Sequence, residues 1–206
     1  MKMSGVSLAV AALLATSTAA PDALALPATP TLATIKAGTY KVDGNHSQVG
    51  FSVLHFGFTN YSGLFGGAAG TLQIDPAHLE AAKLDVTISV DSVTTTVSKL
   101  TAELKGEKWF DTTHFPNATF TSTKVAAASN GETTITGNLT LHGVTKPVVL
   151  HAHLIGSGVN PLDKAYTVGF EATGTVKRSE FGISEYVPAV GDDVPLRIAG
   201  AFELQG

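Results

Sequence analysis

Apolar and polar residues alternate along several stretches of the chain after residue 38. Within residues 83–91, Leu84, Val86, Ile88 and Val90 alternate with charged or hydroxyl-bearing side chains. Successive side chains of a β-strand point to opposite faces of a sheet, so this pattern predicts a strand with one apolar and one solvated face. The same alternation is clear at 166–177 and 194–204, and weaker at 39–43, 69–75, 118–125, 133–141 and 147–155.

Two stretches depart from this alternation. Residues 49–56 are apolar on both faces, which predicts a strand in a more covered position. Val97, Leu100 and Leu104 recur at helical spacing, and Gly106 is placed to end the turn. We therefore expect one short helix that crosses or plugs one end of a sheet.

The stretches predict about eight or nine strands, joined by turn signals such as Asn130-Gly131 and His142-Gly143. The fold class is therefore all-β and antiparallel. Such strands can pack as two sheets or close into a barrel, and periodicity alone does not choose between them. Closure removes exposed sheet edges, and an eight-stranded barrel is wide enough to hold a small ligand. An aromatic content of only 7% favours a less crowded interior.

The first residues predict export. Lys2 precedes an uncharged apolar run at 6–15 that is too short to span a bilayer, and Ala23 and Ala25 suit a signal-peptidase site. We expect a signal peptide at 1–25, a flexible lead-in at 26–37 and one barrel domain at 38–206. No later segment is apolar for the roughly 18 residues that a membrane helix requires, so an integral membrane protein is not expected.

Composition excludes several functions. A net charge of −4 provides no basic stripe for nucleic acid. The absence of cysteine excludes disulfides, thiol catalysis and cysteine-ligated metals. The chain has no Gly-x-Ser-x-Gly sequence of a serine hydrolase, and the glycines near residue 66 lack the lysine of a phosphate-binding loop. We expect no cofactor and no enzymatic activity.

Histidines offer the one alternative chemistry. His151 and His153 lie two apart on a predicted strand and project from one face, as metal ligands often do. His46, His55 or His142 could supply a third ligand only through the fold. The simpler interpretation places both histidines on the solvated face. A metal-dependent periplasmic enzyme is therefore the alternative hypothesis, and an accessory protein with a packed interior is a third.

Several motifs together resemble the YceI-like family and cover nearly the whole chain after residue 38. They are YKVD at 40–43, HS at 46–47, FSVLHFG at 51–57, GLF at 63–65, GTL at 70–72, FD at 110–111, FPNATF at 115–120, GNLTLHGVTKPV at 137–148, RSEFGI at 178–183 and VGDDV at 190–194. One position departs from the pattern, since Glu103 stands where relatives often carry histidine before the leucine of the helical segment.

The resemblance implies an eight-stranded antiparallel lipocalin-like β-barrel with a small helical insertion, usually periplasmic, that binds polyisoprenoids or related long amphiphiles without catalysis. A homodimer is compatible with the sequence. The apolar faces of the predicted strands supply the candidate lipid-binding wall, which comprises Phe51, Val53, Val86, Ile88, Val90, Leu139, Leu141, Val168, Phe170, Ile198 and Phe202. The candidate residues of the pocket mouth are His46, His55, Arg178 and Tyr186.

Overall fold

The computed structural model describes residues 31–127 and 131–206, so the expected signal peptide lies outside the described residues. The strands are β1 (Gly38–Val42), β2 (Gln48–His55), β3 (Thr59–Phe65), β4 (Ala69–Ile74), β5 (Lys83–Ser89), β6 (Asn117–Ala127), β7 (Glu132–Leu141), β8 (Val144–Val159), β9 (Tyr166–Lys177) and β10 (Asp193–Leu204). The helices are α1 (Ser98–Leu104) and the 3-10 turns η1 (Leu32–Thr34), η2 (Leu79–Ala81), η3 (Val90–Ser92) and η4 (Arg178–Phe181).

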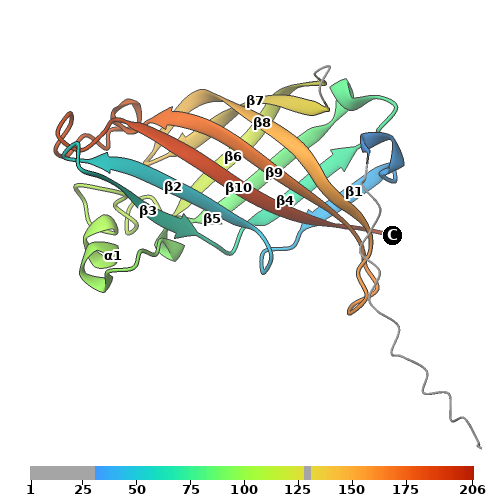
Figure 1. Ribbon diagram of the computed structural model, residues 1–206, viewed down its shortest axis with the longest axis horizontal. Helices are drawn as coiled ribbons and strands as arrows, with labels where there is room; N and C mark the ends of the chain where they lie inside the picture. The colour runs from blue at the N-terminus through green and yellow to red at the C-terminus, as the bar shows by residue number, and fades with distance from the viewer. Residues whose placement is uncertain (1–30, 128–130) are drawn as a thin grey trace, which may run out of the picture.

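All ten strand segments belong to one antiparallel sheet that closes on itself (Figure 1). The ring runs β1-β4-β5-β6-β7-β8-β9-β10 and returns from β10 to β1. β10 pairs along its length with β9, and its other edge pairs first with β2 and then with β1. β3 pairs with β2, and β4 pairs with β1. β1 and β2 therefore act as one strand and β3 and β4 as the next, so the ten segments make eight barrel strands. The predicted eight-stranded antiparallel barrel is confirmed.

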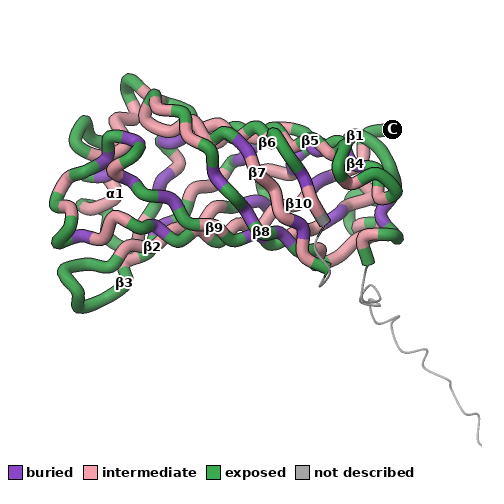
Figure 2. The backbone as a smooth tube through the Cα atoms, turned by 90° about the horizontal axis from the view of Figure 1, so that it is seen from above, coloured by how far each residue is buried: buried purple, intermediate pink, exposed green. Residues whose placement is uncertain are grey.

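Buried and exposed residues alternate along the strands, as the periodicity predicts (Figure 2). β9 has the predicted bounds, and β5 and β10 agree with them to within two residues. β3 was not predicted, because Asn60, Ser62 and Gly63 interrupt any apolar period. The expectation that residues 49–56 lie in a covered position is wrong for the end of this stretch: residues 49–53 are partly buried, but Leu54 is 47% and Phe56 48% exposed. This segment lies at the rim of the barrel, where β2 pairs with β10 only through residues 48–51.

One end of the barrel is closed by a packed core. Tyr40 and Val168 are fully buried there, together with Ile35 from the segment before β1. The Tyr40 hydroxyl donates a hydrogen bond of 2.6 Å to the Lys36 carbonyl, and burial raises the pKa of Tyr40 to about 12. The folded barrel therefore includes residues 32–37, which the sequence predicted as a flexible lead-in. The side chain of Ile35 is buried because it packs into the core at the closed end of the barrel.

The other end of the barrel carries the helical insertion (Figure 1). α1 confirms the predicted helix and buries Leu104, and the amide of Gly106 donates to the Glu103 carbonyl at 3.0 Å as the helix ends. The isolated bridge between Leu64 and Thr94 ties β3 to the segment that leads into α1. The segment that leads into α1 thus lies beside β3.

Candidate functional site

A large apolar hollow opens at the α1 end of the barrel, with a volume of about 650 Å³. The inner faces of β2, β3 and β10 form one side of it, and α1 and the segments after α1 and η4 form the other. Its polar lining is sparse and includes His55, Thr95, Glu103 and Arg178. This volume lies in the range of about 300–1,000 Å³ that is typical of ligand sites.

Two smaller hollows continue along the barrel interior. The middle hollow of about 190 Å³ shares Phe65, Leu141, Val176 and Leu196 with the large one. The far hollow of about 100 Å³ lies under η1 and η2. It shares five lining residues with the middle hollow, namely Leu84, Leu150, Ile198, Gly200 and Phe202. The interior is therefore an incompletely filled apolar space that runs from the α1 end towards the closed end.

The structure brings ten of the eleven predicted wall residues to this space. Phe51 and Val53 line the large hollow, and Phe170 lines the far one. The middle hollow accounts for the others, which are Val86, Ile88, Val90, Leu139, Leu141, Ile198 and Phe202. Val168 differs, because it is fully buried in the closed-end core and is not among the residues that line the three hollows. Contact of these residues with a lipid stays a prediction.

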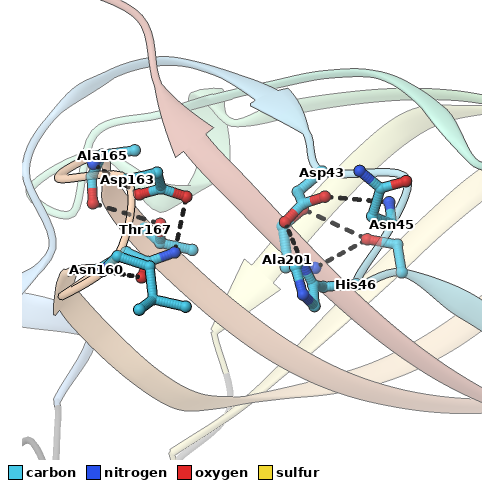
Figure 3. A network of polar contacts seen from close by, with 10 residues as sticks. Asp43, Asn45, His46, Asn160, Asp163, Ala165, Thr167 and Ala201 are labelled. Carbon is cyan, nitrogen blue, oxygen red and sulfur yellow. Dashed lines mark hydrogen bonds and ion pairs between the residues drawn. The ribbon is translucent and has the colours of Figure 1, made fainter.

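Of the four predicted mouth residues, three lie at the large hollow. His55, Arg178 and Tyr186 line it, and the Tyr186 residue is 55% exposed. His46 lies elsewhere, in the turn between β1 and β2, where 74% of its side chain is exposed (Figure 3). The turn directs the imidazole outward because its Nδ1 hydrogen-bonds the Asp43 carboxylate.

The His46–Asp43 contact changes the protonation of both partners. The hydrogen bond to the Asp43 carboxylate, followed by its charge, raises the pKa of His46. Partial burial opposes ionisation of Asp43, but hydrogen bonds from His46 and from the Asn45 amide hold the pKa of Asp43 below its usual value. This pair is a turn-stabilising contact, as the Asp-Gly-Asn-His sequence indicates.

Arg178 is mainly structural. Its residue is only 5% exposed, and its guanidinium donates four hydrogen bonds to backbone carbonyls. The acceptors are Gly191 at 2.8 Å, Ile183 at 3.0 Å, Glu185 at 2.9 Å and Val190 at 2.8 Å. Burial lowers the pKa of Arg178 from its usual value. An arginine side chain has five N–H donors. The four hydrogen bonds made by Arg178 hold the loop that borders the large hollow.

Aromatic residues at the end of β3 and in the segment after α1 complete the large hollow and were missed by sequence reasoning. Phe65 and Phe110 form an aromatic cluster with Phe51, with ring centres 5.2 to 6.2 Å apart. Trp109 lies 6.4 Å from Tyr186 between ring centres. The adjacent aromatic pair at 109–110, shortly after the end of α1 at Leu104, was the available signal. Strand periodicity could not find it, because this segment has no period.

The histidine pair of the metal hypothesis lies on the outer face of β8. His151 contacts Glu132 at 3.2 Å and His153 contacts Glu171 at 3.6 Å, all four side chains being at least 40% exposed. Across residues 31–127 and 131–206, no three His, Cys, Asp or Glu side chains converge in a group that could hold a metal ion. The simpler interpretation, a solvated outer face, agrees with this arrangement.

In the part of the chain that the structure describes, every helix is too short or too polar to cross a membrane.

The similarity of this chain to known proteins extends along the barrel. The sequence profile of the YceI-like domain matches residues 40–202. Protein YceI of Salmonella arizonae is 39% identical over 165 residues, which is 79% of this chain and 85% of that protein.

Two solved structures share the architecture. A YCEI protein of Campylobacter jejuni is 32% identical with a TM-score of 0.65, covering 72% of this chain and 88% of that one. A polyisoprenoid binding domain from Saccharophagus degradans shares the fold at 15% identity and a TM-score of 0.61, covering 81% and 98%. The profile match across the barrel and the identity to protein YceI show that the chain belongs to the YceI-like family.

Proposed function

We propose that this protein binds a long apolar lipid of the isoprenoid class inside its barrel and performs no catalysis. Isoprenoid quinones, polyprenyl lipids and fatty-acid-like amphiphiles are the ligands that fit. The observation that carries the proposal is the series of three apolar hollows that share lining residues from the α1 end inward. A tail can lie along this space while its head group stays at the wide end.

Burial of the tail provides enough free energy for binding. Each methylene removed from water contributes about 0.8 kcal/mol, so ten to fifteen carbons contribute on the order of 8–12 kcal/mol. Ordering of the ligand offsets several kcal/mol of this. Micromolar binding corresponds to about 8 kcal/mol, so tails at the upper end of this range reach that affinity without a strong polar anchor.

The head group would lie among the few polar side chains of the large hollow. The hydroxyl of Tyr186 and the imidazole of His55 can donate hydrogen bonds to a carbonyl or phosphate oxygen. Glu103 can accept one from a hydroxyl. Arg178 contributes less, because four of its donors already bond to backbone carbonyls.

Family membership and the predicted signal peptide support this function. The Saccharophagus degradans domain of the same fold is named for polyisoprenoid binding. The signal-peptide pattern at 1–25 favours the periplasm, where an apolar lipid that moves between membranes must be shielded from water. We therefore include carriage of the lipid through the periplasm in the proposal.

Trp109, the single tryptophan of the chain, provides a direct test because it lines the large hollow. We expect native mass spectrometry of the purified protein to show a co-purifying lipid. After delipidation, added quinones should quench the fluorescence of Trp109 saturably, and an unlabelled polyprenol should reverse the quenching. Protein that carries no lipid, shows no saturable quenching by quinones and binds no added polyprenol or fatty acid in native mass spectrometry would sink the proposal.

A further inference from the structure

The turn between β2 and β3 exposes large apolar side chains at the rim of the barrel. Phe58 is 86% exposed, Phe56 48% and Leu54 47%. Single exposed apolar residues are common on protein surfaces, but a cluster at the tip of a hairpin marks an interaction site. The outward apolar residues of β2, which the periodicity wrongly assigned to a covered position, belong to this cluster.

The turn is held in one conformation. Phe56 and Gly57 both have positive φ, at 51° and 74°, as in the tight turns of β-hairpins, and the Phe58 amide donates to the His55 carbonyl at 3.0 Å. The amide of Phe56 donates to Ala189 at 2.9 Å, and that of Gly191 donates to Leu54 at 2.8 Å. The backbone that carries the exposed rings is therefore already ordered before contact.

The same rim borders the large hollow. His55, Phe56, Val97 and Tyr186 all line it, and Val97 and Tyr186 are 48% and 55% exposed. A lipid that enters or leaves at this end passes over these side chains. Because every lipid carbon exposed to water is unfavourable, transfer is easiest when the rim touches the surface that holds the lipid.

We propose that the β2–β3 turn, with Phe58 at its tip, docks the mouth of the large hollow onto the surface of a lipid bilayer. This inference rests on the proposed function, since it identifies the partner from which the barrel takes its lipid. Phe58 inserts its ring among the acyl chains, and the adjoining opening then faces the membrane.

The charge of the residues around the β2–β3 turn indicates which kind of lipid bilayer the turn can bind. Residues 54–60 contain no Asp, Glu, Lys or Arg. The nearby Lys105 and Lys108 are paired with Asp91 at 3.0 Å and with Glu185 at 3.1 Å. Because residues 31–127 and 131–206 place no cluster of unpaired basic side chains beside this turn, docking uses apolar insertion rather than attraction to anionic lipids. Zwitterionic vesicles should therefore bind, and added salt should change the binding little.

The opposite end of the barrel offers a matched control. Leu162, at the tip of the β8–β9 hairpin, is 89% exposed, and this hairpin lies at the C-terminal end in Figure 1. The pairing along β10 shows that the β8–β9 hairpin and the β2–β3 turn lie towards opposite ends of the barrel. Residue 167, near the β8–β9 hairpin, pairs with Glu203 at one end of β10, and Phe51 of β2 pairs with Leu196 near the other end. Leu162 resembles Phe58 in exposure, but it lies at the closed end of the barrel, beyond the buried Tyr40 and Val168.

The test is flotation of the exported, delipidated protein with phosphatidylcholine vesicles at low and high salt. We expect Phe58→Ser to weaken vesicle binding by about ten- to hundredfold, as expected for the loss of one buried aromatic ring. Phe58→Leu and Leu162→Ser should stay within about twofold of the wild type. Quinone quenching of Trp109 without vesicles should be unchanged in Phe58→Ser, because Phe58 is not among the lining residues of the large hollow.

Each other outcome overturns the docking inference in a distinguishable way. Wild-type protein that binds quinone but not vesicles refutes docking and leaves the proposed function standing. Loss of vesicle binding in Leu162→Ser, but not in Phe58→Ser, assigns docking to the other end. A wild-type dimer that becomes monomeric in Phe58→Ser, without vesicle binding, makes the turn a contact between two copies. Absence of any co-purifying lipid, together with absence of binding to added quinones, polyprenols and fatty acids in solution, refutes the proposed function itself.

Discussion

The guanidinium of Arg178 lies over the indole ring of Trp109, with its central carbon 5.5 Å from the ring centre. This contact joins the two irregular segments that border the large hollow. Trp109 belongs to the segment after α1, and Arg178 holds the carbonyls of Ile183, Glu185, Val190 and Gly191. The mouth of the barrel therefore depends on one buried cation.

Replacing Arg178 should destabilise the protein. Arg178→Met leaves the carbonyls of this loop without their donor, so we expect the free energy of unfolding to fall by about 3–5 kcal/mol. Urea denaturation measures it. The chain's other arginine, Arg197, is exposed on β10 and provides the control, since Arg197→Met should change stability by less than about 0.5 kcal/mol. An Arg178→Met protein as stable as the wild type contradicts this role.

Filling the middle hollow should select against long ligands. Ala118 lines this hollow on β6, and Ala118→Phe places a ring where a tail would lie. We expect the affinity for a long-chain quinone to fall at least about tenfold, equivalent to about 1.4 kcal/mol, while a short-chain quinone still binds in the large hollow. Titration of Trp109 quenching measures both.

Thr121→Phe is the control for this substitution, because Thr121 is exposed and lies three residues along the same strand on the opposite face. It should bind both quinones as the wild type does. Equal losses for short and long chains in Ala118→Phe would mean that the tail does not extend into the middle hollow.

Gly63 should tolerate no side chain. A Cβ at this position would lie 2.4 Å from Cζ of Phe51 and 3.0 Å from the Thr94 carbonyl oxygen. Gly63→Ala must therefore displace the Phe51 ring towards the large hollow, and we expect the free energy of unfolding to fall by about 1–3 kcal/mol. Gly66→Ala, with nothing within 4 Å of its Cβ, is the control and should be nearly neutral. Thermal unfolding of both variants measures the difference.

The His46–Asp43 pair should make stability depend on pH. The raised pKa of His46 means that its stabilisation is complete below the unfolded pKa of about 6.5 and is lost as pH rises through the folded value. The lowered pKa of Asp43 means that its contribution is lost as pH falls below about 4. The advantage of the wild type over His46→Gln should therefore be larger at pH 5.5 than at pH 8.5.

Melting temperatures at these two values check the prediction. His78→Gln is the control, because it removes an exposed histidine whose nearest carboxylate, Glu80, is 3.5 Å away. An advantage over His46→Gln that does not change with pH would show that the pair makes no difference to folding.

Particular elements show what could be predicted. The alternation at 166–177 predicts β9 with the right bounds, because inward Val168 and Val176 and outward Thr173 and Lys177 follow from the pleat of a single strand. β3 could not be predicted, because its pairing with β2 compensates for a sequence that lacks an apolar period. Val168 could not be separated from the hollow-lining residues, because the same inward direction leads to a packed core at one end and to open space elsewhere.

By itself, the sequence determined the strand faces, the short helix and the family motifs, since each depends on residues that are near neighbours along the chain. Only the tertiary structure decided that the ring closes, that its interior stays partly empty, and that Phe65, Trp109 and Phe110 complete its wide end. The physical reason is that enclosed space depends on side chains from strands and loops far apart in sequence, whose relative positions no local period encodes.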